Sequence, residues 1–290
     1  LRCLELDGYL EYNAQYIDKT KVSEESQAKR LGTAFHKAME CPESWKDGYE
    51  FMPAVAEQQE LIEIVRMTMD SKSKAEPPRL GEKLNLRKPL HKQYLSLVEA
   101  KAKSHGKVLL TEEQHEIIDV QISAVYDAAD CRDLVGQKNS SNVEMSCVRE
   151  CPVSGLPVKA LVDLLTGPMV VDFKTDRGIN PDQTKRNARK AGYLYQAAHY
   201  LYVTGLTEFR FITVTSEAAL RTGSHCEANS WELNPEHLKQ AHEKNMVALE
   251  TIATAQTMTA LGDETDSQGI PYVWHSKGWG ATRVLSFDDF

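Results

Sequence analysis

The densest group of residues able to do chemistry lies between residues 155 and 176, GLPVKALVDLLTGPMVVDFKTD. If Gly167-Pro168 forms a two-residue hairpin loop, Asp163 lies opposite Asp172 on the facing strand. Facing Cβ atoms are about 5 Å apart, and like charges there repel each other unless a cation neutralises them. Lys174 follows Asp172 by two positions, so its ammonium group shares the face of the carboxylates. Two carboxylates and an ammonium suit metal-assisted attack of water on a phosphodiester: the carboxylates hold Mg²⁺, and the lysine orients the nucleophile or offsets developing charge.

A third carboxylate is available from Glu144, in the preceding predicted strand, if the loop of residues 149–157 returns the chain in register. In the alternative interpretation, Asp163 and Asp172 are exposed strand residues paired with nearby lysines. Both acids interrupt strongly apolar strands, where an unpaired carboxylate is costly. This pattern favours a site.

A helix downstream of the hairpin carries a second group of polar residues. Gln196 and Tyr200 are four positions apart and share one helix face, although the same helix is also explained by aromatic packing on a sheet. Residues 174–190 contain six basic and two acidic residues, which is typical of a solvated face or, beside a site that acts on phosphodiesters, of a track for phosphates. The basic side chains predicted to bind phosphates are Lys29, Arg30, Arg177, Lys185, Arg186, Arg189 and Lys190.

The elements that must position these residues are mostly helical in the first half of the chain. Apolar spacing predicts helices over residues 23–40, 54–69 and about 90–104, and a capping box at Thr111–Gln114 begins another to about 129. Gly32 is unfavourable within the first helix, which suggests a close approach to its backbone. The Lys-, Pro- and Gly-rich residues 71–89 predict a mobile loop or linker.

After Gly136 the hydrophobic period changes to about two, which indicates a sheet. The predicted strands are residues 143–148, 158–165, 169–173 and 209–215. One helix over about 184–203 separates the last two, and Asn234-Pro235 begins another that runs to about 256.

The composition of the chain excludes several classes of protein. With 41% hydrophobic and 26% charged residues among 290, the chain is an ordinary globular protein. A net charge of −8 argues against polybasic binding to nucleic acid or lipid. The uncharged run of residues 191–207 is too short for a membrane helix. Six scattered cysteines predict reduced thiols rather than a disulfide framework. The first residues include neither a Met nor an apolar signal core, so we expect a domain cut from a longer cytosolic product.

The ordered set Leu31-Gly-Thr-Ala-Phe-His36, Glu144, Val162-Asp163, Val171-Asp172-Phe-Lys174 and Gln196-x3-Tyr200 resembles the PD-(D/E)XK nuclease superfamily, specifically its exonuclease VIII (RecE-like) branch. The resemblance runs from about residue 30 to 217 and weakly to about 256. Asp172 stands where some members have Glu. The resemblance implies an α/β fold: a restriction-endonuclease-like core with a mixed β-sheet flanked by helices and a mostly helical N-terminal half. We expect one nuclease domain over 1–290, with a helical part at 1–135, the catalytic core at 136–257 and an irregular tail at 258–290.

The resemblance also implies roles for individual residues. His36, Asp163, Asp172 and the main-chain carbonyl of Phe173 would hold one Mg²⁺, with Mn²⁺ as a substitute, and Glu144 would lie nearby. Lys174 would assist the attacking water. Gln196 and Tyr200 would contact the scissile backbone.

The function implied is a Mg²⁺-dependent exodeoxyribonuclease that degrades the 5′ strand of linear duplex DNA and leaves 3′ single-stranded tails. A ring-shaped tetramer, a RecT-type single-strand annealing recombinase as partner and a bacterial, phage or prophage origin are implied with it. Alternatives are a structure-specific or single-strand endonuclease of the same fold and, less favoured, a noncatalytic DNA-binding module. No phosphate loop for ATP and no cysteine trio for an iron–sulfur cluster is visible in the sequence, so we expect neither cofactor.

Overall fold

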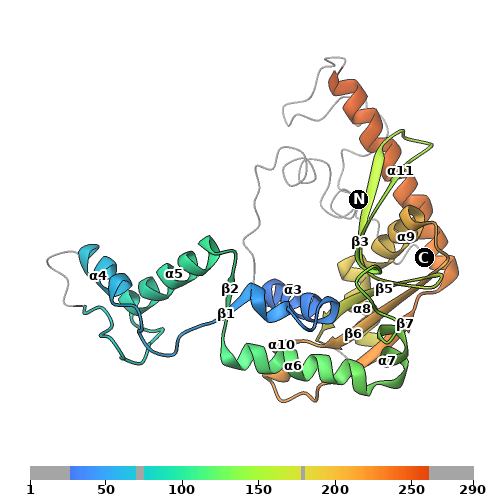
Figure 1. The fold of residues 1–290 in the computed structure, drawn as a ribbon. Helices are drawn as coiled ribbons and strands as arrows, with labels where there is room; N and C mark the ends of the chain where they lie inside the picture. The colour runs from blue at the N-terminus through green and yellow to red at the C-terminus, as the bar shows by residue number, and fades with distance from the viewer. Residues whose placement is uncertain (1–26, 70–74, 178–179, 261–290) are drawn as a thin grey trace. The chain divides into compact units, whose positions relative to one another are not determined.

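The computed structural model describes residues 27–69, 75–177 and 180–260 (Figure 1). The chain divides into two compact units, one made of Leu1–Gly32 with Ser123–Phe290 and the other of Thr33–Ile122. Helix α3 (Gln27–Glu40) begins in the first unit and ends in the second. Residues 1–26 and most of the predicted irregular tail, from 261 onward, lie outside the described residues.

The first unit is built on a mixed five-stranded sheet in the order β3-β4-β5-β6-β7. The strands are β3 (Val143–Glu150), β4 (Pro157–Thr166), β5 (Met169–Asp176), β6 (Glu208–Thr215) and β7 (Ala228–Glu232). Only β5 and β6 run parallel, and the other neighbours are antiparallel. The four predicted strands and the α/β fold class are therefore confirmed. The fifth strand, β7, was missed because its sequence ANSWE alternates weakly and is only partly buried.

The β4–β5 hairpin has the register that its loop predicts. Gly167 adopts φ 57°, the left-handed conformation that a tight hairpin turn requires, and Thr166 pairs with Met169. Pairing continues through Leu165 with Val170 and ends at Leu164 with Val171.

The helical crossover from β5 to β6 is two helices rather than the single helix predicted over 184–203. Helix α8 (Pro181–Ala191) ends at Gly192, whose φ of 70° breaks the helical path, and α9 (Tyr193–Thr204) begins directly after it. A residue in the left-handed conformation ends a helix, and glycine adopts it without a Cβ penalty. The helical pattern of residues 184–203 does not reveal this break, because a lone Gly inside such a pattern is usually tolerated.

Helix α9 covers one face of the sheet. It packs against β3, β4 and β6, and helix α11 (Pro235–Ala260) packs against α9 in turn (Figure 1). The apolar cluster between them includes Val162, Ala197, Phe209 and Leu249. Asn245 of α11 donates to the Tyr195 carbonyl at 2.9 Å, which fixes the two helices together.

Two further helices of the first unit are short. Helix α7 (Ala129–Val135) lies against β7, and α10 (Glu217–Leu220) follows β6.

Helix α6 (Glu112–Asp127) begins in the second unit and ends in the first. It begins at the predicted capping box: Thr111 N donates to Gln114 Oε1 at 2.8 Å, and Gln114 N donates to Thr111 Oγ1 at 3.2 Å.

The second unit contains a helix pair and a small parallel sheet. Helices α4 (Gln59–Met67) and α5 (Pro89–Ser104) pack together, and β1 (Tyr49–Phe51) pairs with β2 (Val108–Leu110) after the short helix η2 (Trp45–Gly48). Buried Tyr94 accepts from the backbone N–H groups of Glu57 and Gln58 at 3.0 and 3.1 Å, at the start of α4. None of the helices in the described part of the chain is long and apolar enough to cross a membrane.

Gly32 does approach another element, but less closely than its sequence position suggests. A Cβ built on Gly32 lies 3.8 Å from Thr175 Oγ1, which is ordinary van der Waals contact. We therefore expect Gly32→Ala to raise the free energy of unfolding by about 0.5–1 kcal/mol, because alanine loses less backbone entropy in a helix.

Urea unfolding of the two proteins measures this difference. Gly192→Ala is the contrasting variant, because φ 70° makes a side chain costly, and it should lower stability by about 1 kcal/mol. A loss of stability in Gly32→Ala would show that the approach to Thr175 tolerates no side chain.

Candidate active site

The two strands of the acidic hairpin separate at the predicted carboxylates. The ladder ends at Leu164 and Val171, so Asp163 and Asp172 do not form the directly facing ladder pair that the register alone predicts. Instead Asp163 Oδ2 accepts from the backbone N–H of Phe173 at 2.8 Å. The Phe173 N–H no longer pairs with the neighbouring strand, and an unpaired N–H is costly to bury. The Asp163 carboxylate satisfies this donor instead.

Asp172 is the most buried ionisable group of the hairpin, with 1% exposure. Gln196 Nε2 donates to its Oδ1 at 2.9 Å, and Lys174 Nζ forms an ion pair with its Oδ2. A buried carboxylate is tolerated only when it is paired and hydrogen-bonded, and both conditions are met here. The structure thus brings together three of the predicted residues, from β5 and α9.

The ammonium group of Lys174 contacts aromatic rings as well as acids. Its Nζ lies 5.3 Å from the ring centroid of Tyr193 and 5.8 Å from that of Phe211. Burial lowers the pKa of Lys174, but the carboxylates of Asp172 and Asp163 outweigh burial and raise it above its usual value. Lys174 is therefore a charged ammonium at neutral pH.

Tyr193 and Phe211 were not singled out for the site from the sequence. Tyr193 precedes Gln196 by three positions and so lies on the same face of α9, a spacing that could have indicated it. Phe211 lies beside Asp172 through the parallel register of β5 and β6, which no local pattern reveals.

Tyr200 completes the polar face of α9. Burial raises the pKa of its hydroxyl above the usual value, and Asp172 raises it further. The phenol therefore stays protonated at neutral pH and is available as a hydrogen-bond donor.

The β3–β4 pairing is interrupted at Glu144, which is exposed. The pairs on either side of it are Val143 with Leu164 and Met145 with Val162, so the connecting loop returns the chain with Glu144 level with Asp163, and the role of Glu144 in the site stays a prediction. Glu144 has φ 47° and is the one non-glycine residue with positive φ in the described part of the chain. Such backbone strain costs of order 1–2 kcal/mol and is concentrated at functional sites.

Two variants separate the backbone of Glu144 from its carboxylate. We expect Glu144→Gly to be more stable than Glu144→Ala by about 1 kcal/mol, because glycine adopts φ 47° without strain. Urea unfolding gives the difference, and equal stabilities would contradict the strained conformation. Both variants should lose to a similar extent any activity that needs this carboxylate.

The predicted DNA-contacting residues of α8 lie on its surface. Lys185, Arg186, Arg189 and Lys190 are all exposed, and Arg177, exposed as well, follows β5. Asn187 of the same helix donates to Asp176 Oδ1 at the end of β5 and so ties α8 to the strand that carries Asp172. Near the start of α3, Lys29 is exposed and Arg30 is partly buried.

His36 lies on the part of α3 that belongs to the second unit. It is half-buried and meets Phe35 edge-to-face, with ring centroids 6.1 Å apart. Glu40 lies one turn later and is buried, which places a carboxylate and an imidazole on neighbouring turns of one helix face. The sequence motif indicates only the histidine of this pair. The predicted role of His36 as a metal ligand stays a prediction, as does that of the Phe173 carbonyl.

The first-unit groups suit a divalent cation of the hard, oxygen-binding class. Asp163 and Asp172 offer carboxylate oxygens on adjacent strands, and the ammonium of Lys174 balances part of their charge. Carboxylate and carbonyl oxygens are the ligands that Mg²⁺ and Mn²⁺ prefer. The donor set therefore fits such an ion.

Comparison with solved structures gives remote similarities. A protein from Eubacterium rectale described as a "putative exonuclease" has 12% identity and a TM-score of 0.38, with 81% of this chain and 87% of that chain covered. LHK-Exo in complex with dAMP has 10% identity and a TM-score of 0.28, with 86% and 100% covered. SSO0001 has 16% identity and a TM-score of 0.25, with 47% and 68% covered. No curated protein matches the chain.

The sequence itself matches the model of the PD-(D/E)XK nuclease superfamily over residues 6–265, a span that includes the hairpin, both helices of the crossover and α3. The superfamily predicted from the ordered motifs is thereby confirmed, whereas the RecE-like branch within it stays a prediction. With most of its length matched and a hairpin that presents Asp163, Asp172 and Lys174, the chain belongs to the PD-(D/E)XK nuclease superfamily.

Proposed function

We propose that this nuclease is a Mg²⁺-dependent exodeoxyribonuclease that acts on the ends of linear duplex DNA. The observation that carries the proposal is the environment of Asp172: a buried carboxylate joined to both Lys174 and Gln196, beside Asp163. End-dependent action rests on the resemblance of the ordered motifs to the exonuclease VIII branch.

Nucleases of this superfamily typically use divalent metal ions. Asp163, Asp172, the Phe173 carbonyl and His36 would hold the ion, with Glu144 near it. When bound, the ion would polarise the phosphate and lower the pKa of a water molecule.

Lys174 has the position of a group that orients the nucleophile. Its ammonium is fixed between a carboxylate and two aromatic rings, so little reorganisation is needed when a water molecule accepts a hydrogen bond from it. The same positive charge offsets negative charge that develops on the phosphate.

Gln196 and Tyr200 hold the neighbouring parts of the site. Gln196 uses one amide hydrogen to fix Asp172, and its remaining donor can bind a phosphate oxygen. Tyr200, protonated at neutral pH, can do the same from one turn further along α9. The exposed basic residues of α8 would bind phosphates of the DNA backbone and make binding depend on salt.

The finer features of the proposal follow the resemblance. They are degradation of the 5′ strand, 3′ single-stranded products for recombination, a ring-shaped tetramer, a RecT-type annealing partner and a cytoplasmic, bacterial or phage setting. None of them is indicated by the environment of Asp172, so they rest on the resemblance alone.

One experiment tests metal, polarity and end dependence together. Linear duplex DNA labelled separately at each 5′ and 3′ end is digested with Mg²⁺ and with EDTA, beside a closed circular duplex. We expect early release of the 5′ label, a resistant circle and no digestion in EDTA. Efficient cutting of circles would favour an endonuclease of the same fold, and failure of both Mg²⁺ and Mn²⁺ would favour a noncatalytic DNA-binding module.

A further inference from the structure

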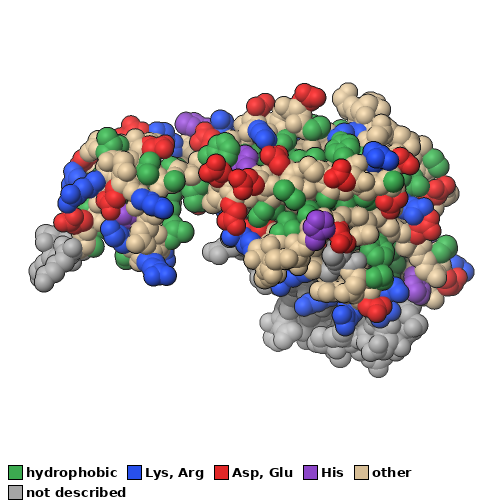
Figure 2. All heavy atoms as spheres, turned by 90° about the horizontal axis from the view of Figure 1, so that it is seen from below, with side chains coloured by type: hydrophobic (Ala, Val, Ile, Leu, Met, Phe, Trp, Pro, Cys, Tyr) green, Lys and Arg blue, Asp and Glu red, His purple; other side chains and the backbone are tan. Residues whose placement is uncertain are grey.

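The second unit contains a segment whose charge is opposite to that of the whole chain. Residues 71–110 contain ten Lys and Arg but three Asp and Glu, whereas the complete chain has a net charge of −8. Eight of those ten basic residues lie in the described part, from residue 79 to 107. Lys and Arg side chains are visible on this part of the molecule at the left of Figure 2. The acidic average therefore conceals a strongly basic segment.

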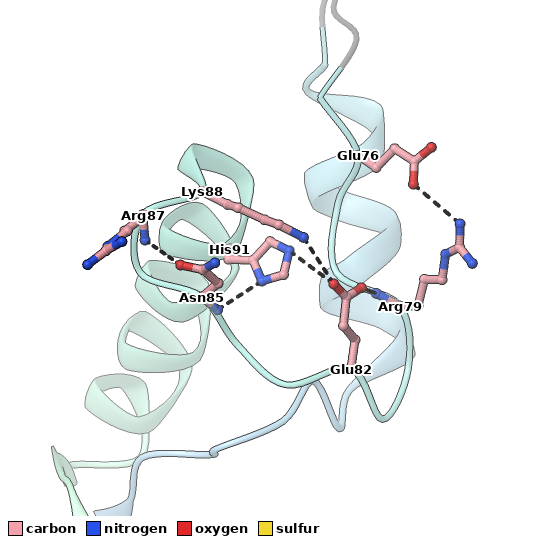
Figure 3. Close-up of polar contacts among 7 residues, drawn as sticks. All are labelled: Glu76, Arg79, Glu82, Asn85, Arg87, Lys88 and His91. Atoms are coloured by element: carbon pink, nitrogen blue, oxygen red, sulfur yellow. Dashed lines mark hydrogen bonds and ion pairs between the residues drawn. The ribbon is translucent and has the colours of Figure 1, made fainter.

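The loop before α5 is held in place, although the sequence predicted a mobile loop or linker over 71–89. Glu82 accepts from the Arg79 backbone N–H at 2.9 Å and from Lys88 Nζ at 3.1 Å (Figure 3). Backbone bonds tie Gly81 and Glu82 to Ala56, at 2.7 and 2.9 Å. These bonds give the loop the defined conformation that its composition does not indicate.

His91 holds the other end of this loop. It is fully buried, and its Nδ1 accepts from the Asn85 backbone N–H at 3.1 Å (Figure 3). Burial lowers the pKa of His91, so the ring stays neutral and keeps this acceptor at neutral pH. Asn85 in turn accepts from the Arg87 backbone N–H at 2.9 Å, which sets the direction in which the chain enters α5.

The acidic residues of the segment leave several basic side chains without an ionic partner. Glu76 pairs with Arg79, and Glu82 pairs with Lys88. In the described part of this segment, residues 75–110, four further basic side chains are exposed and form no ion pair: Lys83, Arg87, Lys92 and Lys103. Their positive charge is therefore available to a ligand.

These charges surround the start and the exposed face of α5. Arg87 and Lys88 precede the helix, Lys92 lies one turn inside it, and its first turn contains no acidic residue. Positive side chains at the positive end of a helix dipole are unfavourable in the free protein, and a bound anion relieves this repulsion. From Lys92 to Lys103 the helix rises about 17 Å, roughly the length of five base steps along one DNA strand.

We propose that the basic arm, defined as residues 79–103 of the loop and α5, is a second DNA-binding surface that contacts backbone phosphates. This rests on the proposed function for the identity of the polyanion. Leu80 and Leu86 are each 59% exposed beside Arg79 and Arg87, which adds apolar contact for sugars or bases. An anionic membrane is less well matched, because the apolar face of α5, with Tyr94, Leu95 and Val98, is buried in the core of the unit.

The test measures binding without cleavage. The parent protein carries Asp172→Asn, and the arm variant adds Arg87→Gln/Lys92→Gln to it. Each protein is titrated into a fluorescent DNA duplex in EDTA at several salt concentrations, which gives the Kd and its dependence on salt. The matched control is Arg132→Gln/Lys239→Gln, which removes the same charge from exposed positions on α7 and α11. We expect the arm variant to bind several-fold more weakly, with a salt slope smaller by about 1.8, and the control to match its parent.

Unchanged affinity and unchanged salt slope in the arm variant would overturn the proposal. It would also be overturned if vesicles of phosphatidylserine and phosphatidylcholine bound the parent but not the arm variant while DNA affinity stayed the same. The outcome is separate from the proposed function, because binding in EDTA needs no catalysis. A protein that never cuts DNA but loses affinity with the arm variant would support the arm and refute the exonuclease.

Discussion

Asp172→Asn is expected to reduce metal-dependent DNA digestion by roughly three orders of magnitude. Asparagine keeps the shape of the side chain, and its carbonyl can still accept from Gln196, but it has no charge for a divalent cation or for Lys174. Metal stabilisation of transition-state charge is worth several kcal/mol, and about 1.4 kcal/mol corresponds to each tenfold in rate. Initial rates on linear duplex at saturating Mg²⁺ measure the effect.

The fold should survive this substitution, because Asp163 remains beside Lys174 as a counter-charge. Circular dichroism and thermal unfolding check that point. Asp176→Asn is the matched control: Asp176 is also a buried carboxylate on β5, but it accepts from Asn187 rather than from the site residues. Its rate should stay within about tenfold of the parent. If Asp172→Asn kept that much activity, the assignment of the site to this hairpin would be wrong.

Lys174→Ala is expected to lower kcat by about 10²–10⁴ while the Kd for DNA changes by only a few-fold. The Lys174 side chain is 15% exposed and its ammonium is held by Asp172, Tyr193 and Phe211, so we expect it to act at the reacting phosphate rather than along the DNA backbone. The rate constant of cleavage is measured under single-turnover conditions, and the Kd for DNA is measured separately in EDTA.

Lys185→Ala is the contrasting variant, because Lys185 is an exposed residue of α8 in the predicted phosphate track. It should weaken DNA binding and leave kcat unchanged. A loss confined to DNA affinity in Lys174→Ala would contradict its proposed role with the nucleophile.

Metal dependence of stability gives a second measurement on Lys174→Ala. Without the ammonium, the carboxylates of Asp163 and Asp172 repel each other with no internal counter-charge. The variant should therefore unfold at a lower temperature than the parent in EDTA and gain more from added Mg²⁺. Equal gains in the two proteins would show that Lys174 does not balance those acids.

The order of elements and the chemical character of the site are determined by local sequence. Alternating apolar residues around Asp163 and Asp172 specify two strands, Gly167-Pro168 specifies their turn, and the register then follows, because strand side chains have a period of two. The spacing of Gln196 and Tyr200 specifies a shared helix face in the same way. These properties depend on residues that are close together in the chain, so they can be predicted from the sequence alone.

Several features depend on contacts between residues far apart in the chain. The hairpin separates at Asp163 because β5 continues along β6 while β4 continues along β3, and neither partner strand is predictable from the hairpin itself. Phe211 reaches Lys174 through the parallel register with β6, and the break at Gly192 lets α9 place Tyr193 beside the same lysine. The loop before α5 was predicted to be mobile because its composition is that of a linker, but Glu82 and His91 fix it through bonds that composition cannot show.

Residue type and spacing within single elements therefore predict which acids, which lysine and which polar helix residues form a site for phosphodiester chemistry. The burial of Asp172 against Lys174 and Gln196 follows instead from the packing of separate elements, as does the exposure of particular charges in a chain with net charge −8. Burial, pairing and the resulting pKa shifts arise when separate elements exclude water from the same place.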